Sequence, residues 1–179
     1  QLRERAVHDS LTGLLNRAGL IDTLARRLQR SEPDAFVLAF IDLDGFKAVN
    51  DARGHPVGDA LLCAVAELLL GHAGRDAVVA RLGGDEFVLL LGPDRDAADA
   101  LAALLCRRLA EPFAIGGQTL RIGASIGLVA CPDDGHDPVE LMRRADLAMY
   151  AAKGAGRARH AWFDATMDER VAARAWLQA

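Results

Sequence analysis

At 179 residues, the chain is long enough for one domain with a full hydrophobic core and too short to suggest two. A hydrophobic content of 51%, with 21 basic and 25 acidic residues, is ordinary for a soluble globular protein. The net charge of −4 argues against a broad basic surface for polymeric nucleic acid, whereas a nucleotide needs only a few local groups.

The hydrophobic pattern predicts helices that alternate with strands. The run "AFVLAFIDL" is short and almost entirely apolar, which suits a strand buried on both faces. The predicted helices cover residues 17–30, 59–70, 93–110, 137–153 and 167–178, and the predicted strands cover residues 35–43, 76–82, 86–91, 113–115, 119–130 and 159–164. Residues 44–59 are expected to form a short helix and a loop. This order indicates an α/β (α+β) fold, in which helices pack on one central mixed, mainly antiparallel sheet.

Two acids, Asp42 and Asp44, come at the end of the first buried strand. A strand delivers its last residues to the edge of the sheet, where open α/β folds bind ligands. Its period of two puts both side chains on the same side. The two acids could instead cap the helix that follows, and the local pattern alone does not decide between these interpretations.

The stretch "RLGGDEFVLL" places two glycines and two acids between two predicted strands. Gly83 and Gly84 suit a tight type I′ hairpin turn and, lacking a Cβ atom, let a ligand approach the backbone. Asp85 and Glu86 are expected at the first positions of the return strand, with side chains on opposite faces. If this hairpin pairs beside the first strand, Asp85 meets Asp42, and two adjacent carboxylates require a cation such as Mg²⁺ or Mn²⁺. A solvated acidic turn is the alternative.

Basic and amide side chains accompany these acids. Lys47 follows the first strand, while Lys153 and Arg157 lie at and just beyond a helix C-terminus, where the helix dipole alone would favour positive charge. Asn50 and Asp59 together can read the edge of guanine, because a carboxylate accepts from its N–H groups and an amide contacts its acceptors. Asn50 could otherwise be a helix-terminus residue, and Asp59 an N-cap.

Five blocks of the sequence, in the same order, resemble the GGDEF domains of the diguanylate cyclase family. They are "DSLTGLLNR", "FIDLDGFKAVNDARGHPVGDALL", "ARLGGDEFVLLL", "ASIGLVACPDDG" and "ELMRRADLAMYAAKGAGR", and they extend over nearly the whole chain. The resemblance implies a palm-like fold shared with class III nucleotide cyclases. It also implies a GGDEF domain over residues 1–163 and a C-terminal helical linker over residues 164–179.

Domains of this family condense two GTP molecules into cyclic di-GMP and release two pyrophosphates, with one GTP per domain and two domains meeting as a homodimer. The resemblance implies two Mg²⁺ (or Mn²⁺) ions per active site, held by Asp42, the Leu43 carbonyl, Asp85 and Glu86. The implied catalytic residues are Glu86, Asp85 and Asp42. The implied substrate contacts are Lys47, Gly45, Phe46, Lys153 and Arg157 at the phosphates, Gly83 and Gly84 beside the nucleotide, and Asn50 and Asp59 at guanine.

Family members often follow a sensory domain and precede an EAL phosphodiesterase domain, and "QLRERAV" and "FDATMDERVAARAWLQA" resemble the connecting helices. We therefore expect a piece of a longer signalling protein. A catalytically silent GTP-binding module that regulates an attached EAL domain is the alternative to an active cyclase. Scattered cysteines without a CxxC pair, and no apolar run near the roughly 20 residues of a membrane span, indicate a cytoplasmic location, either free or as part of a membrane-anchored protein.

The sequence departs from the family at its product-inhibition motif, RxxD. The two positions of that motif hold Gly74 and Ala77, and the neighbouring Arg75 and Asp76 lack the required spacing. We predict no feedback inhibition through this site, so added cyclic di-GMP should leave the initial rate of GTP turnover unchanged. Strong inhibition that an Arg75→Ala substitution abolishes would contradict this prediction.

Overall fold

The computed structural model of the chain describes residues 6–30 and 34–177, and side chains as far as residue 171. Its helices are α2 (Arg17–Leu28), α3 (Phe46–Arg53), α4 (His55–Ala73), α5 (Arg95–Leu109), α6 (Pro138–Gly154) and α7 (Ala165–Leu177). Its strands are β1 (Phe36–Asp44), β2 (Val78–Gly83), β3 (Glu86–Leu91), β4 (Phe113–Ile115), β5 (Gln118–Leu120), β6 (Gly123–Cys131) and β7 (His160–Trp162). The first residues of the expected entry helix and the last residue of the expected final helix lie outside the described residues.

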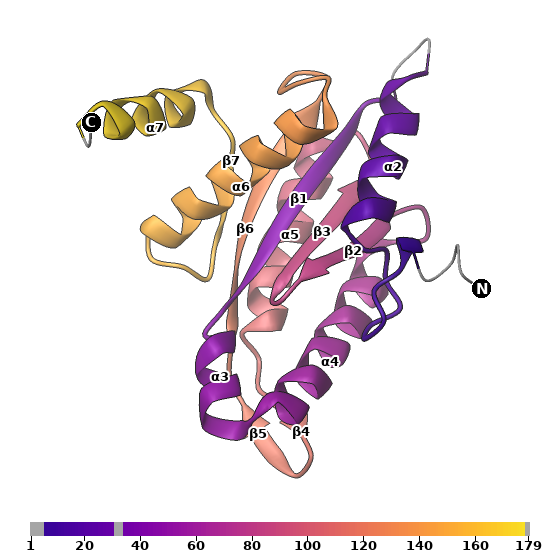
Figure 1. Cartoon of the computed structure of the whole chain (residues 1–179), viewed down its shortest axis with the longest axis vertical. Helices are drawn as coiled ribbons and strands as arrows, with labels where there is room; N and C mark the ends of the chain where they lie inside the picture. The colour runs from indigo at the N-terminus through magenta and orange to yellow at the C-terminus, as the bar shows by residue number, and fades with distance from the viewer. Residues whose placement is uncertain (1–5, 31–33, 178–179) are drawn as a thin grey trace.

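One five-stranded sheet, in the order β2-β3-β1-β6-β7, forms the centre of the molecule (Figure 1). Its neighbouring strands are antiparallel except for β6 and β7, which are parallel. Strands β4 and β5 form a separate two-stranded sheet. The predicted fold class, a mixed and mainly antiparallel sheet with flanking helices, is confirmed.

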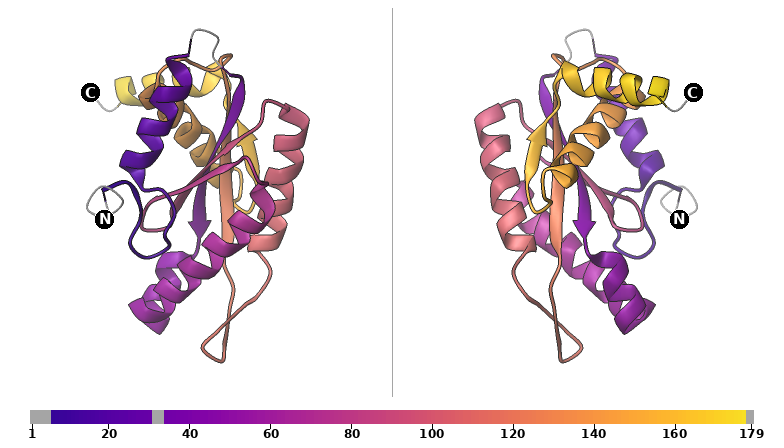
Figure 2. Two further views of the ribbon diagram at one scale, coloured as in Figure 1. Left: turned by 90° about the vertical axis from the view of Figure 1, so that its right-hand side faces the viewer. Right: turned by 90° about the vertical axis from the view of Figure 1, so that its left-hand side faces the viewer.

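The sheet separates two hydrophobic clusters, each covered by its own helices (Figure 2). Alternate residues of β1 divide between them: Val37, Ala39 and Ile41 belong to the cluster with α4 and α5, and Leu38 and Phe40 to the cluster with α2 and α6. This alternation follows from the period of two along a strand. It puts the even-numbered residues at the end of β1, the acids of the site, on the α2 and α6 face.

The predicted strand over residues 119–130 is wrong as a single element, because it is divided between β5 and β6. Strand β1 ends at Asp44, whose partner in β6 is Gly123. The residues before Gly123 therefore have no partner in the main sheet, and Gln118–Leu120 pairs with β4 instead.

The loop expected before the second helix is also wrong. Only Gly54 separates α3 from α4, and its φ of 87° is a conformation that glycine tolerates well. Helix α4 begins at His55 with Pro56 in its first turn, a favourable position for proline. Asp59 consequently lies within the helix rather than at its N-cap.

Helix α4 is long and apolar enough by composition to cross a membrane, and it is the one such helix among the described residues. Its apolar side contributes Leu61, Val65 and Leu69, all fully buried, to the cluster on the sheet. Core packing therefore accounts for one side of α4, and about a third of its apolar window is buried, 33%.

Helix α6 packs against β6 at a point where only glycine fits. A Cβ atom added at Gly127 would lie 2.0 Å from the Ala145 carbonyl oxygen and 2.3 Å from the Met149 nitrogen, both in the backbone of α6. Real Cβ atoms do not approach backbone so closely, so the absence of a side chain sets the separation of helix and sheet. Because Lys153 lies further along α6, this contact also sets the position of that side chain.

We predict that Gly127→Ala lowers the free energy of unfolding by about 1–3 kcal/mol, the usual effect of overpacking a core. Urea denaturation monitored by circular dichroism measures the change. The control is Gly92→Ala, because a Cβ atom at Gly92 would meet nothing within 4 Å. Equal stability of the two variants would contradict the close-packing interpretation.

Candidate active site

The centre of the site is Asp42, near the end of β1. The Lys153 ammonium on α6 lies 3.0 Å from Asp42 Oδ1 and 3.8 Å from Asp44 Oδ1. The Asp42 and Lys153 side chains are largely buried, with 15% and 22% of their surfaces exposed. The sheet register places Glu86, the first residue of β3, directly opposite Asp42. The predicted approach of the "GGDEF" hairpin to the first strand is thus present.

The hairpin turn differs from the predicted one. Gly83 pairs with Glu86, so the turn residues are Gly84 and Asp85 rather than the two glycines. Gly84 has a φ of 50°, but Asp85 is not among the described residues with positive φ, which excludes a type I′ turn. The cause is an irregularity in the ladder between Arg81 and Gly83. Asp85 is therefore a turn residue rather than the first residue of the return strand.

Two sets of hydrogen bonds hold this turn. The Leu43 amide of β1 donates to the Asp85 carbonyl at 3.2 Å. On the other side, the Arg81 guanidinium donates to the Gly84 carbonyl at 2.9 and 3.1 Å and to Asp9 Oδ1 at 2.8 Å. Arg81 and Asp9 are nearly buried, and charge-assisted bonds of this kind are stronger than neutral ones. The turn is therefore fastened both to the sheet and to the segment that precedes α2.

The two acids of the hairpin have different neighbours. Burial, followed by the charge of Asp42, raises the pKa of the Asp85 carboxyl above its usual value, and Lys153 opposes this shift. Burial also raises the pKa of the Glu86 carboxyl, and Asp42 and Asp146 raise it further. Glu86 and Asp146 line a hollow of about 330 Å³ between α2 and α6. Asp42 therefore has two acidic neighbours, Asp85 and Glu86, and its charge affects both.

Asp44 holds the backbone next to Arg157 in place through hydrogen bonds. The Ser125 hydroxyl donates to the Asp44 carboxylate at 2.9 and 3.1 Å, and the Ala158 amide donates at 3.0 Å. Arg157 and Ala158 have positive φ values of 62° and 51°, which is uncommon for residues other than glycine. Strained backbone of this kind is kept at functional sites when the surroundings hold it in place. Asp44 is one such restraint.

Five of the residues expected to contact the substrate lie in or beside α3 and α4, namely Gly45, Phe46, Lys47, Asn50 and Asp59. Gly45 is the N-cap of α3, with a φ of 84° and no side-chain cap hydrogen bond. The first N–H groups of the helix therefore remain available to an anion, and Lys47 is exposed beside them. Asn50 lies within α3 and Asp59 within α4, the helix that follows after one residue. Phe46, by contrast, has a buried side chain and can offer only its backbone N–H.

The donor set fits a hard divalent cation only in part. Among the described residues, no three acidic, histidine or cysteine side chains form a complete metal cage. Mg²⁺ is usually held by one or two carboxylates together with substrate phosphates and water, and Asp42 and Asp85 can supply that share. Burial raises the pKa of the Asp85 carboxyl and the charge of Asp42 raises it further, and the Lys153 ammonium only partly offsets this negative charge. The residues therefore suit a metal that arrives with a phosphate ligand.

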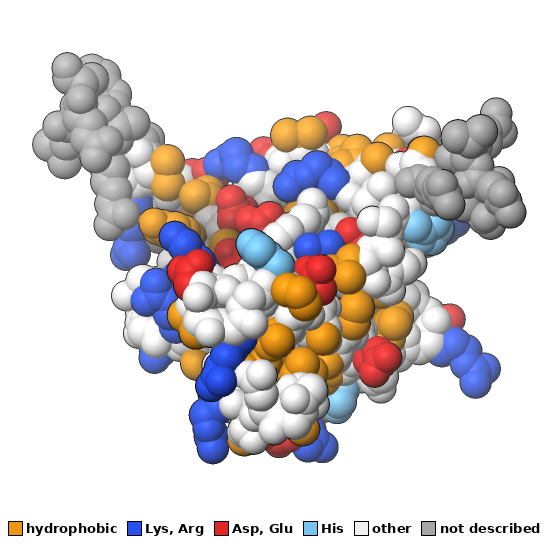
Figure 3. Space-filling view, turned by 60° about the horizontal axis from the view of Figure 1, so that its bottom comes forward, with side chains coloured by type: hydrophobic (Ala, Val, Ile, Leu, Met, Phe, Trp, Pro, Cys, Tyr) orange, Lys and Arg blue, Asp and Glu red, His pale blue; other side chains and the backbone are white. Residues whose placement is uncertain are grey.

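The face of the molecule around α3 and the small sheet carries acidic and basic side chains side by side (Figure 3). This mixture agrees with the small net charge of −4. A local cluster of a few charged groups, rather than a single basic surface, is what this face offers to a ligand.

The sequence pattern described as "Diguanylate cyclase, GGDEF domain" matches residues 6–159. The chain belongs to the GGDEF family. Its sequence is 46% identical over 94% of the chain to MucR of Pseudomonas aeruginosa, a bifunctional diguanylate cyclase/cyclic di-GMP phosphodiesterase. It is 38% identical over 99% of the chain to PdeR of Escherichia coli, a cyclic di-GMP phosphodiesterase. The chain spans about a quarter of the length of these relatives, 25% and 27% respectively.

Solved structures give the same assignment. The GGDEF domain of TpbB, also called YfiN, from Pseudomonas aeruginosa superposes with a TM-score of 0.84 at 35% sequence identity, over 92% of this chain and 98% of that one. The resemblance drawn from the five sequence blocks is therefore confirmed for family and fold. The individual roles of the site residues and the domain boundary at residue 163 stay predictions.

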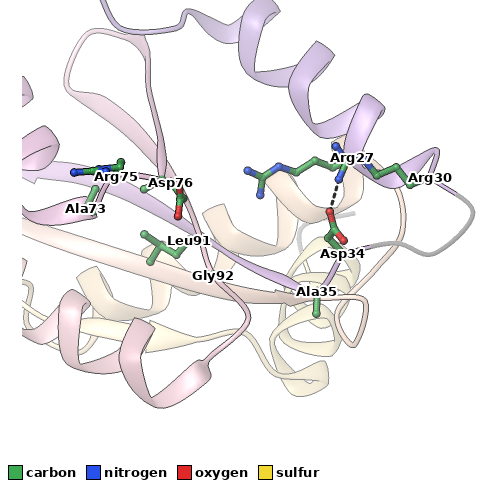
Figure 4. Close-up of a pocket in the computed structure, with 11 residues that line it drawn as sticks. Arg27, Arg30, Asp34, Ala35, Ala73, Arg75, Asp76, Leu91 and Gly92 are labelled. Carbon is green, nitrogen blue, oxygen red and sulfur yellow. Dashed lines mark hydrogen bonds and ion pairs between the residues drawn. The ribbon is translucent and has the colours of Figure 1, made fainter.

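The region of the missing RxxD motif forms a hollow of about 470 Å³ at the opposite end of β1 from Asp42 (Figure 4). Gly74 and Ala77 line it, as do Arg75 and Asp76. Figure 4 shows the Arg75 side chain directed away from Asp76. These two residues do not form the ion pair that their charges would allow, and the absence of feedback inhibition stays a prediction.

We predict that Asp85→Asn stabilises the domain at neutral pH in the absence of ligands. The folded state binds a proton at Asp85 more tightly than the unfolded chain does, because burial and the charge of Asp42 raise the pKa of this carboxyl above its ordinary value. Ionised Asp85 thus lowers stability at neutral pH, and this penalty disappears as the pH falls through the raised pKa. Thermal unfolding should therefore show a higher melting temperature for Asp85→Asn than for the parent at pH 7.5.

The difference between variant and parent should shrink as the pH falls toward 4. Asp51→Asn, at an exposed position on α3, is the matched control and should change little at any pH. An Asp85→Asn variant that melts below the parent at pH 7.5 would contradict the electrostatic account.

Proposed function

We propose that this GGDEF domain is a diguanylate cyclase that condenses two GTP molecules into cyclic di-GMP and two pyrophosphates. The observation that carries the proposal is the convergence of Asp42, Asp85 and Lys153 from β1, the hairpin turn and α6. Catalysis of phosphoryl-type transfer depends mainly on positioning and on charge stabilisation, so a nucleophilic side chain is not required.

Asp42, Asp85, Glu86 and the Leu43 carbonyl would hold Mg²⁺, which when bound lowers the pKa of a hydroxyl nucleophile and stabilises charge on the triphosphate. With the substrate phosphates as further ligands, the ion would have the complete set of oxygen ligands that the carboxylates alone do not provide. In the same arrangement the Lys153 ammonium, already beside Asp42, has only to exchange a carboxylate oxygen for a phosphate oxygen. Two ions per site, Mg²⁺ or Mn²⁺, are part of the proposal.

The remaining contacts bind and orient the nucleotide. Lys47, Arg157 and the N–H groups at the start of α3 are suited to the phosphates, because they offer positive charge and unpaired donors. Asn50 and Asp59 are suited to guanine, since an amide and a carboxylate complement its acceptors and donors. Each GTP must both attack and be attacked, so two domains, each with one GTP, would act as a homodimer.

A second candidate is a GTP-binding module that regulates an attached phosphodiesterase without turning GTP over. The similarity to PdeR, which is named as a phosphodiesterase, favours keeping this candidate. The intact "GGDEF" stretch and the filled carboxylate positions favour the cyclase. We further propose that the domain acts in the cytoplasm within a longer protein, between a sensory domain and an EAL domain.

The test is formation of cyclic di-GMP by the purified domain with GTP and Mg²⁺, followed by chromatography. We expect product from the parent and a loss of about 100-fold or more in Glu86→Ala, comparable with the removal of one catalytic charge. Glu67→Ala, at an exposed position on α4, is the control and should retain the parent rate.

Because dimerisation can limit the rate, the same assay is repeated with each domain fused to a parallel coiled coil that forces dimers. Tight GTP binding without any product, even in the forced dimer, would contradict the cyclase and support the regulatory module.

A further inference from the structure

We infer that Gly58 is a specificity-determining residue that sets the spacing of the guanine-reading pair Asn50 and Asp59. The inference rests on the proposed function to the extent that these two residues contact the base. It concerns Gly58 itself, which binds nothing and acts through its neighbours.

The space that a side chain would need at Gly58 is occupied by Asn50. A Cβ atom added at Gly58 would lie 1.8 Å from Asn50 Oδ1 and 2.9 Å from Asn50 Cγ. It would also lie 3.3 Å from the Phe46 ring. The first two distances are below any real Cβ contact, so the carboxamide of Asn50 lies in a niche that exists only because residue 58 is glycine.

Packing, rather than hydrogen bonding, holds the Asn50 amide in this niche. Its Oδ1 atom is buried and has no hydrogen-bond partner within the part of the chain that the structure describes. An unpaired buried polar atom normally costs free energy, so the position of Oδ1 is explained by its packing against Gly58 and not by a hydrogen bond. The Nδ2 group is not among the buried unpaired atoms, which leaves its N–H donors on the side open to a ligand.

Backbone conformation gives no reason for glycine at this position. Gly58 lies inside α4 and is not among the residues with positive φ, so alanine could adopt the same backbone. In a helix interior, alanine is favoured over glycine. The glycine is therefore explained by the space it leaves for Asn50.

Relief of the clash would change the geometry of the base site whichever partner moves. If the Asn50 side chain moves, its donors leave their position; if the first turns of α4 move, they carry Asp59 with them, because it follows Gly58 directly. Discrimination between purines depends on having the amide and the carboxylate at the correct separation. A site built to hydrogen-bond a ligand loses more affinity for the ligand that uses every bond than for one that uses fewer.

The experiment compares Gly58→Ala with Gly71→Ala in the whole domain. Gly71 lies in the same helix, and a Cβ atom there would meet nothing within 4 Å, so its substitution changes only helix propensity. Equilibrium binding is measured for GTP and for inosine triphosphate, which lacks the 2-amino group, and thermal unfolding is recorded for each variant. We expect Gly58→Ala to weaken GTP binding and to lower the ratio of GTP to inosine triphosphate affinity by about tenfold. Gly71→Ala should retain the parent ratio.

A double-mutant cycle with Asn50→Ala separates the niche from a general effect on folding. Removing the Asn50 carboxamide removes the atoms that the new Cβ atom strikes, so Gly58→Ala should have no further effect on the ratio in that background. This double variant also keeps the inference testable if Gly58→Ala alone does not fold, because it should then be folded.

Three results would overturn the inference: an unchanged ratio in folded Gly58→Ala, an equal change in Gly71→Ala, or a full effect of Gly58→Ala in the Asn50→Ala background. Binding is measured without turnover. A parent that binds GTP selectively but makes no product would therefore overturn the proposed cyclase activity and leave the role of Gly58 standing. A parent that binds no GTP would overturn both.

Discussion

The repulsion among carboxylates around the end of β1 is the constraint on which the site depends. Asp42, Asp44, Asp85 and Glu86 are brought together by one strand and one hairpin. Burial raises the pKa values of the Asp85 and Glu86 carboxyls, and the charge of Asp42 raises them further. The ion pair with Lys153 at 3.0 Å partly offsets this charge in the ligand-free domain. Such a cluster lowers the stability of the ligand-free domain, and destabilising groups of this kind are typical of functional positions, here the proposed cation site.

Three close approaches provide the remaining geometry. Gly127 lets α6 lie against β6 and so brings Lys153 to Asp42; Arg81 fastens the hairpin turn to the segment before α2; and Gly58 leaves room for Asn50 between α3 and α4. None of these residues needs to contact a substrate. Each of them fixes the position of a group that the proposed function uses, which is the requirement for catalysis by positioning.

Much of this arrangement could be predicted from the sequence, because local rules apply to it. The period of two along a strand placed Asp42 and Asp44 on one side, and the hairpin pattern brought "GGDEF" beside them. The turn type was wrong because a ladder irregularity at Arg81 has no local signal. The bonds from Ser125 and Ala158 to Asp44 join residues 81 and 114 positions apart, and such contacts depend on the assembled sheet rather than on local pattern.

The central claim is that Asp42 and Asp85 form a cation site from which Lys153 is displaced toward phosphate. The most direct measurement is anomalous diffraction from crystals grown with Mn²⁺ and a GTP analogue that cannot react. We expect an anomalous peak between the Asp42 and Asp85 carboxylates, with the Lys153 ammonium moved from Asp42 to a phosphate oxygen. Bound analogue with Mn²⁺ elsewhere, and with Lys153 still paired with Asp42, would contradict the account.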